Sequence, residues 1–262
     1  DLSDTPGQAI NAELGTDILI NVEAVLGSAL DDSITGSSGN NSLGGFDGDD
    51  SISGGAGDDT IDGGSGNDDI DGGSGTDYLT FNGAAGGIGF QAANGVVSVA
   101  GFGTDMFSGV EGVVGTEFGD TLTAGGGISI LNGGAGNDTL VSSSGDDTLI
   151  GGAGDGDLGD YSFATGNVTV DLGISSAQNT GTEFGTDVLS GIENITTGAG
   201  NDLISGDSAD NTLDGGAGDD TFILNGATDA TDSITGVRGT DRIVHTHDGA
   251  CTLNSLPGNN SV

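Results

Sequence analysis

A nine-residue repeat constrains this chain more than any other feature. From residue 27 to residue 80 the sequence divides without insertion into six nonapeptides: GSALDDSIT, GSSGNNSLG, GFDGDDSIS, GGAGDDTID, GGSGNDDID and GGSGTDYLT. The eighth position is always apolar, and we expect it to point inward between two outward neighbours, as in a very short strand. The glycines and acids before it are typical of a turn. The predicted inward residues are Ile34, Leu43, Ile52, Ile61, Ile70 and Leu79.

Two further blocks of the same kind follow. Residues 115–159 read GTEFGDTLT, AGGGISILN, GGAGNDTLV, SSSGDDTLI and GGAGDGDLG, and residues 197–223 read TGAGNDLIS, GDSADNTLD and GGAGDDTFI. We expect both blocks to keep the nine-residue register. Their predicted inward residues are Leu122, Leu131, Leu140, Leu149, Leu158, Ile204, Leu213 and Phe222.

A longer repeat, of more than eighty residues, contains the nonapeptide blocks. The segments GTDILINVE (15–23), GTDMFSGVE (103–111) and GTDVLSGIE (185–193) each precede a nonapeptide block at the same offset. Glu23, Glu111 and Glu193 are therefore equivalent positions, 88 and 82 residues apart. We interpret the chain as three long repeats, 1–102, 103–184 and 185–262, and we expect it to be part of a longer repetitive protein.

The charge of the chain limits its partners. It carries 41 Asp and Glu against 2 Lys and Arg, a formal net charge of −39. Such a surface repels nucleic acids and anionic lipids and attracts cations. No run approaches the roughly 18 apolar residues of a membrane-spanning helix, so we expect no membrane insertion. A single cysteine, Cys251, excludes an internal disulfide framework.

A single nonapeptide cannot hold itself together. Fixing nine residues costs roughly 9 to 18 kcal/mol, whereas burying one Leu or Ile returns about 1.5 to 3 kcal/mol. Stacked turns also bring sixth-position carboxylates close to one another, where they repel. Calcium, which accepts six to eight oxygen ligands in flexible geometry, removes both problems better than magnesium does. The predicted ligands are Asp32, Asp50, Asp59, Asp68, Asp77, Asp120, Asp138, Asp147, Asp202 and Asp220.

The glycines of the turns belong to the same prediction. Carbonyls that approach an ion closely, and turn positions with positive φ, exclude a Cβ. We expect the second and fourth residues of the most regular units to contribute in this way. These glycines are Gly55, Gly57, Gly64, Gly66, Gly73, Gly75, Gly134, Gly136, Gly216 and Gly218.

Four units match the pattern GGxGxDxUx at every defined position: residues 54–62, 63–71, 133–141 and 215–223. They resemble the calcium-binding nonapeptide repeats of the RTX family. The spacers GTDVLSGIENI and YSFATGNVTVDLG resemble those of large RTX proteins, and DSITGVRGTDRIV (232–244) resembles a segment that closes the last block.

The resemblance implies an all-β fold, a right-handed parallel β-roll (β-solenoid) with coils of about 18 residues and calcium in the turns. It implies calcium between turns two units apart, which gives about eight ions for blocks of six, five and three units. It also implies type I secretion of an unfolded chain that folds on calcium binding outside the cell, where calcium modules bind at about 10⁻⁴ to 10⁻³ M.

Several residues depart from the pattern. Asn41 and Ser129 replace the sixth-position aspartate, and GGAGDGDLGD places its acids at 155, 157 and 160. Glu23, Glu111 and Glu193 fall at the sixth position when the register is extended backward. They are either ligands or caps of the turn stack. His245 and His247, with Cys251 four residues after the second, are a candidate transition-metal site.

The repetition favours structure over catalysis. The motifs HExxH, GxSxG and GxxxxGK are absent from the sequence. We expect a non-catalytic, calcium-binding β-roll of a secreted bacterial surface protein, such as a surface layer, fibre or adhesin, whose partners are calcium and copies of itself. The alternative is the C-terminal export and folding module of a type I secreted RTX enzyme, a protease or lipase.

Overall fold

The computed structural model describes residues 8–11, 15–17, 22–91, 95–125, 129–225 and 232–245. The regular elements in these ranges are β-strands. None of the described residues forms a helix long and apolar enough to cross a membrane. The chain consists of two compact units, Asp1–Ile130 and Leu131–Val262. The three-way division into long repeats stays a prediction.

The N-terminal unit begins with the antiparallel pair β1 and β2 and continues with parallel strands. Within it, β3, β5, β7, β9 and β13 follow one another in one sheet, and β4, β6, β8 and β12 in another. The strands are β1 (Gln8–Asn11), β2 (Gly15–Asp17), β3 (Ala24–Leu26), β4 (Ser33–Thr35), β5 (Ser42–Asp47), β6 (Ser51–Ala56), β7 (Thr60–Ser65), β8 (Asp69–Ser74), β9 (Tyr78–Leu79), β10 (Gly89–Gln91), β11 (Val96–Val99), β12 (Gly103–Ser108), β13 (Gly112–Val114) and β14 (Thr121–Thr123).

The C-terminal unit repeats this arrangement. Within it, β16, β18, β22, β24 and β26 follow one another in one sheet, and β19, β23, β25 and β27 in another. The strands are β15 (Ile130–Ala135), β16 (Thr139–Val141), β17 (Thr148–Ala153), β18 (Leu158–Asp160), β19 (Thr169–Asp171), β20 (Gln178–Gly181), β21 (Gly185–Ser190), β22 (Asn194–Thr196), β23 (Leu203–Ser205), β24 (Thr212–Asp214), β25 (Thr221–Leu224), β26 (Ser233–Thr235) and β27 (Arg242–His245).

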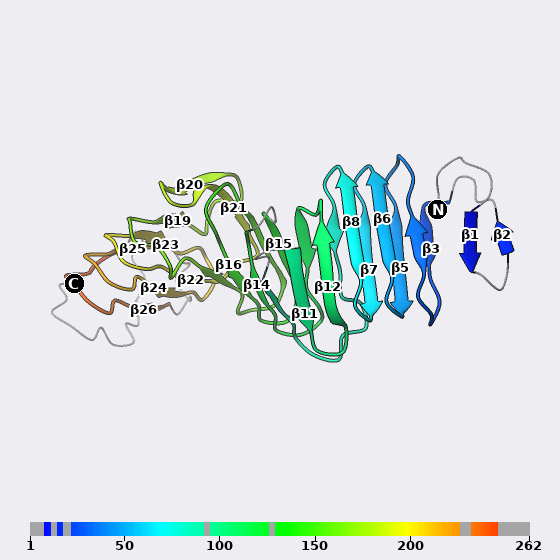
Figure 1. The fold of residues 1–262 in the computed structure, drawn as a ribbon. Helices are drawn as coiled ribbons and strands as arrows, with labels where there is room; N and C mark the ends of the chain where they lie inside the picture. The colour runs from blue at the N-terminus through cyan, green and yellow to red at the C-terminus, as the bar shows by residue number, and fades with distance from the viewer. Residues whose placement is uncertain are drawn as a thin grey trace. The chain divides into compact units, whose positions relative to one another are not determined.

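The nine-residue period sets the path of the chain. Successive nonapeptides alternate between two sheets, so each strand pairs with the strand two units away. Ser33 pairs with Ser51, and Ser51 pairs with Asp69. The same step of two nonapeptides relates β3 to β5 and β5 to β7, and these strands lie side by side in Figure 1. The predicted parallel β-solenoid with 18-residue coils is confirmed for this block.

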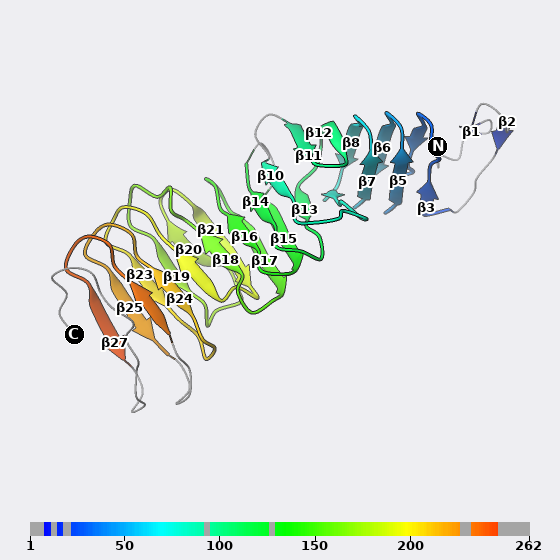
Figure 2. The same ribbon diagram turned by 90° about the horizontal axis from the view of Figure 1, so that it is seen from below.

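The core of each coil is built from the predicted inward residues. Every one of them except Leu158 is buried, and Ile61, Leu122, Leu131, Leu140, Leu149, Ile204, Leu213 and Phe222 have no exposed surface. Within a regular block they pair with their counterparts one coil away, as Ile52 does with Ile70 and Ile204 does with Phe222. Figure 2 shows β23, β25 and β27 stacked in this way. The apolar eighth position therefore predicts the core of the nonapeptide blocks almost completely, but not that of the spacers.

The prediction for Leu158 was wrong, and so was the strict nine-residue register of the second block. Leu140 pairs with Gly159, and Leu158 is only half-buried. The unit GGAGDGDLGD has ten residues, which shifts its strand by one and reverses which side chains face the core. Gly159 fits there because a Cβ would lie 2.9 Å from Cδ1 of Ile195. The fully buried ring of Tyr161 follows two residues later.

The spacers between blocks add hairpins and aromatic residues. In the N-terminal unit β11 pairs antiparallel with β12, and in the C-terminal unit β20 pairs antiparallel with β21. The ring of Phe81 lies 6.1 Å from that of Phe90 and 5.9 Å from that of Phe102. Tyr161 and Phe184 make a T-shaped pair at 5.0 Å in the other unit. The spacers therefore supply the bulky core that the short repeats lack.

Candidate metal sites

The sixth-position aspartates form a ladder along the turns. The Oδ1 of one accepts the backbone N–H of the sixth residue one coil away. The distance is 2.7 Å from Asp32 N to Asp50 Oδ1 and 2.9 Å from Asp50 N to Asp68 Oδ1. On the other side of the solenoid, Asn41 N donates to Asp59 and Asp59 N to Asp77, at 2.7 and 2.8 Å. One carboxylate oxygen thus fixes the stacking of the turns.

The ten aspartates at sixth positions lie in the turns between strands, in line with one another in successive coils. Nine of the ten are buried, with exposures of 3% or less, and Asp32 is half-buried. The ladder brings Asp50 next to Asp68 and Asp59 next to Asp77. In the C-terminal unit, Asp202 N donates to Asp220 at 2.9 Å. The sixth-position aspartates therefore gather as stacked, buried carboxylates.

The second oxygen of most of these carboxylates has no partner. Burying a charged oxygen without a hydrogen bond or counter-ion is costly. Such atoms are uncommon in folded proteins and call for a missing group. The buried Oδ2 atoms without a hydrogen-bond partner belong to Asp50, Asp59, Asp68, Asp77, Asp157, Asp202, Asp220 and Asp241. Hard carboxylate oxygens of this kind fit a calcium ion.

The glycines of the turns leave room around these oxygens. All ten glycines predicted at second and fourth positions have positive φ. Glycines at the first position, which the sequence analysis did not select, have a different role. A Cβ on Gly54, Gly63 or Gly215 would lie 2.4 Å from Oδ2 of the aspartate in the same turn. These three glycines therefore keep the space beside the aspartate oxygen open.

Glu111 and Glu193 continue the ladder at the end of a block. Glu111 Oε2 accepts the N–H of Asp77, and Glu193 Oε2 accepts the N–H of Asp157, each at 3.0 Å. The side chain of Glu23 is exposed, while its carbonyl accepts the N–H of Ser42 at 2.7 Å. Glu111 and Glu193 thus take the place of a sixth-position aspartate, as extending the register backward predicts.

Five acids of the ladder escaped the sequence analysis as candidate ligands, and one of them, Asp232, accepts the N–H of Asn211 at 3.1 Å. Asp105 and Asp187, in the GTD segments, accept the N–H groups of Asp68 and Asp147 at 3.0 and 2.9 Å. Asp157 accepts the N–H of Asp138 at 2.8 Å, and Asp241 that of Asp220 at 3.1 Å. For Asp241 the signal was present, because GVRGTDRIV keeps the first glycine, the fourth glycine and the sixth-position acid.

Burial makes these carboxylates hard to ionise. It raises the pKa of Asp50, Asp187 and Asp220 to about 6 and that of Asp105 to about 7, and neighbouring carboxylates add to the effect. Burial also raises the pKa of Asp59, Asp68, Asp77, Asp157 and Asp202. At neutral pH the turns therefore favour a bound cation, and a proton takes its place only as the pH falls toward these values.

A pH dependence follows for the calcium-free chain. A folded-state pKa above the unfolded value gives stability that is complete below the unfolded pKa of about 3.9 and is lost as pH rises through the folded value. Without calcium, we expect stability to increase as pH falls from about 7 to about 4. Far-ultraviolet circular dichroism of metal-free protein across this range tests it, because a chain that is unfolded at pH 7 should gain β signal on acidification. A β signal that stays absent down to about pH 4 would contradict the prediction.

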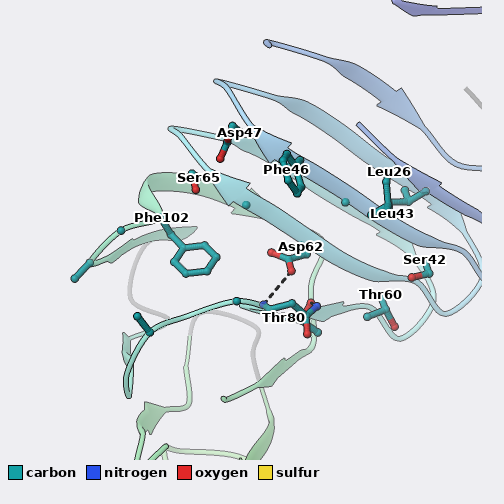
Figure 3. Close-up of a pocket in the computed structure, with 17 residues that line it drawn as sticks. Leu26, Ser42, Leu43, Phe46, Asp47, Thr60, Asp62, Ser65, Thr80 and Phe102 are labelled. Atoms are coloured by element: carbon teal, nitrogen blue, oxygen red, sulfur yellow. Dashed lines mark hydrogen bonds between the residues drawn. The ribbon is translucent and has the colours of Figure 1, made fainter. Parts of the chain in front are cut away.

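A separate cavity of about 570 Å³ lies in the N-terminal unit, beside the outer surface of β5 and β7. Figure 3 shows Phe46, Asp62 and Phe102 around it. Asp62 Oδ2 accepts the backbone N–H of Asn82 at 2.9 Å. The described lining includes acids and hydroxyl groups but no His, Cys, Lys or Arg. Among the predicted site residues, only Gly64 lines this cavity.

The histidine candidate is largely outside the described residues. His245 ends β27, whereas His247 and Cys251 fall beyond the part of the chain that the structure describes. In the described ranges, no group of three or more His, Cys, Asp or Glu side chains could by itself hold a metal ion.

Stacked parallel coils with glycine-rich turns and buried aspartates define a β-solenoid with metal-binding turns. The model of the RTX calcium-binding nonapeptide repeat (4 copies) matches residues 26–43, 44–79, 114–149, 133–158 and 186–222. These ranges cover more than half of the chain, which therefore belongs to this family. It is a calcium-binding β-roll module.

The chain is also similar to a solved structure. The extracellular lipase LipA from Serratia marcescens is 18% identical, with a TM-score of 0.18. The match covers 85% of this chain and 34% of the lipase, so the chain corresponds to about a third of that protein. No curated protein matches the sequence.

Proposed function

We propose that this chain is a non-catalytic part of a larger secreted bacterial protein, in which a calcium-loaded β-roll serves as a rigid element of a surface layer, fibre or adhesin. The observation that carries the proposal is the set of buried, stacked aspartate oxygens without partners in both units. Such oxygens suit a structural cation. The near-threefold long repeat supports a structural role, because repetition adds length and does not add chemistry.

In this proposal calcium lies between sixth-position aspartates of successive coils. The pairs Asp50 with Asp68, Asp59 with Asp77, and Asp202 with Asp220 would supply carboxylate oxygens. Backbone carbonyls of the glycine turns would complete the six to eight ligands that calcium takes. Calcium binding at the millimolar level of extracellular modules would then couple folding to arrival outside the cell.

Light scattering tests the structural role. Above the calcium concentration that folds the chain, we expect the apparent molar mass from light scattering to rise with protein concentration. The reason is that a lattice or fibre element associates with copies of itself. Magnesium at equal concentration is the control. An apparent molar mass that stays at the monomer value would contradict self-association. It would favour an export and folding module, which an HExxH or GxSxG motif in the flanking gene sequence would then support.

A further inference from the structure

The turns of this solenoid are of two kinds, which differ in what the second aspartate oxygen contacts. In the first kind, the second residue of the same nonapeptide donates its backbone N–H to Oδ2. The distance from the backbone N to Oδ2 is 2.6 Å for Ser28 and Asp32, 2.6 Å for Thr116 and Asp120, and 2.9 Å for Ser143 and Asp147. We call these the capped turns.

Hydroxyl groups strengthen each capped turn. Ser28 Oγ lies 3.0 Å from Asp32 Oδ2, Thr116 Oγ1 lies 3.1 Å from Asp120 Oδ2, and Ser142 Oγ lies 2.8 Å from Asp147 Oδ2. This is the side-chain capping that serine and threonine commonly provide in turns. The protein itself therefore satisfies the oxygen that a calcium ion would need.

In the second kind, which we call the open turns, Oδ2 is buried and has no hydrogen-bond partner. The second residue of these nonapeptides is never serine or threonine. For six of them it has positive φ, including Phe46 at +87°, the only non-glycine residue with positive φ in the described ranges. The second residues and their aspartates are Phe46 with Asp50, Gly55 with Asp59, Gly64 with Asp68, Gly73 with Asp77, Gly152 with Asp157, Gly198 with Asp202, Gly216 with Asp220, and Val237 with Asp241.

Two asparagines show that a capped turn needs no charge. Asn41 Oδ1 accepts the N–H of Ser37 at 2.6 Å, and Asn211 Oδ1 accepts that of Asp207 at 2.9 Å. Both therefore occupy the sixth position with the capped geometry. The oxygens of the open turns all belong to aspartate. A neutral amide meets the needs of a cap, whereas two positive charges call for carboxylates.

We propose that the second residue of each nonapeptide decides whether its turn takes calcium. Open turns hold the ion, and turns capped by serine or threonine are closed without metal. Asp32, Asp120 and Asp147 then serve as calcium-independent staples, and the chain binds fewer ions than the eight that the repeat count suggests. This inference rests on the proposed calcium-loaded roll and specifies which of its turns are loaded.

Two substitutions in one ladder test this inference. Asp32 and Asp50 are adjacent on the same side of the N-terminal unit, but Asp32 is capped and Asp50 is open. Bound calcium per chain is measured by equilibrium dialysis and atomic emission. We expect Asp50→Asn to lose about one ion and to lower the calcium-dependent rise in melting temperature. Asp32→Asn should keep the parental number of ions, because Asn41 in the next nonapeptide already has the same capped geometry.

The outcomes separate this inference from the proposed function. A parent chain that binds no calcium refutes the proposed function. A parent chain that binds calcium, with Asp32→Asn losing an ion as Asp50→Asn does, overturns only the division into two kinds of turn. If Asp50→Asn fails to fold, Asp147→Asn provides the second capped test. Loss of an ion in that variant overturns the inference, and an unchanged number supports it.

Discussion

Removal of calcium at neutral pH is expected to abolish the β-roll. Without a cation, eight described aspartates of the ladder keep a buried Oδ2 that no hydrogen bond satisfies, in a chain with a net charge of −39. Each site contributes about 2.7 kcal/mol when free calcium is 100 times its Kd. A few such sites together equal the free energy of unfolding of a typical domain, roughly 5 to 15 kcal/mol. Without them, we expect the folded state to be no longer stable.

A titration from a chelated start measures this effect. We expect the far-ultraviolet circular dichroism of the metal-free chain to be that of an unfolded protein, and the β signal to appear cooperatively by about 10 mM calcium. Sodium chloride at matched ionic strength is the control, because general screening also reduces repulsion between carboxylates. A full β signal in chelator, or an unfolded chain at 10 mM calcium, would contradict the prediction.

The sequence predicts the coils well because the nonapeptide encodes its own structure locally. One apolar residue every nine positions selects both a strand and its inward face, as the complete burial of Ile61 and Leu140 shows. The same period predicts the ladder of aspartates. It fails at Gly159, where a tenth residue shifts the strand while the apolar Leu158 still falls at the eighth position.

The spacers were beyond sequence reasoning because the nine-residue period does not fix how far along the chain their partners lie. Met106 pairs with Asp69 and Val188 pairs with Thr148, 37 and 40 residues apart, whereas strands within a block pair across 18 residues. Tyr161 shows the consequence most clearly. Its hydroxyl donates to Oδ2 of Asp187 at 2.9 Å, and Thr180 Oγ1 donates to the same oxygen. No local pattern relates these three residues, so only the fold reveals that Asp187 has protein partners for both oxygens.

The caps of the turns were visible in the sequence but their meaning was not. Ser28, Thr116 and Ser143 stand where the most regular units have the second glycine of the GG pair, and the sequence analysis assigned them no role. Their hydrogen bonds to Asp32, Asp120 and Asp147 show that these turns have a specific geometry of their own. A departure from a repeat can therefore be a second kind of turn.

Replacing Gly66 by alanine is expected to prevent normal stacking of its turn. A Cβ on Gly66 would lie 1.8 Å from the carbonyl oxygen of Gly48 in the neighbouring coil, and Gly66 has φ of +150°. The clash is with backbone, so no side-chain rotation relieves it. We expect Gly66→Ala to lose about 3 kcal/mol or more of the free energy of unfolding in saturating calcium, from strain and overpacking together.

Two control variants separate the causes of that loss. Gly83 has φ of +86° and nothing within 4 Å of a Cβ. Gly83→Ala should therefore lose only the contribution of backbone strain, about 1 to 2 kcal/mol of the free energy of unfolding. Gly86 has neither a left-handed φ nor a close neighbour, so Gly86→Ala should change stability by less than about 1 kcal/mol. Urea denaturation at fixed calcium measures all three. Equal losses for Gly66→Ala and Gly83→Ala would show that the coils can separate to admit a methyl group, and the close contact between turns would then not be needed for stability.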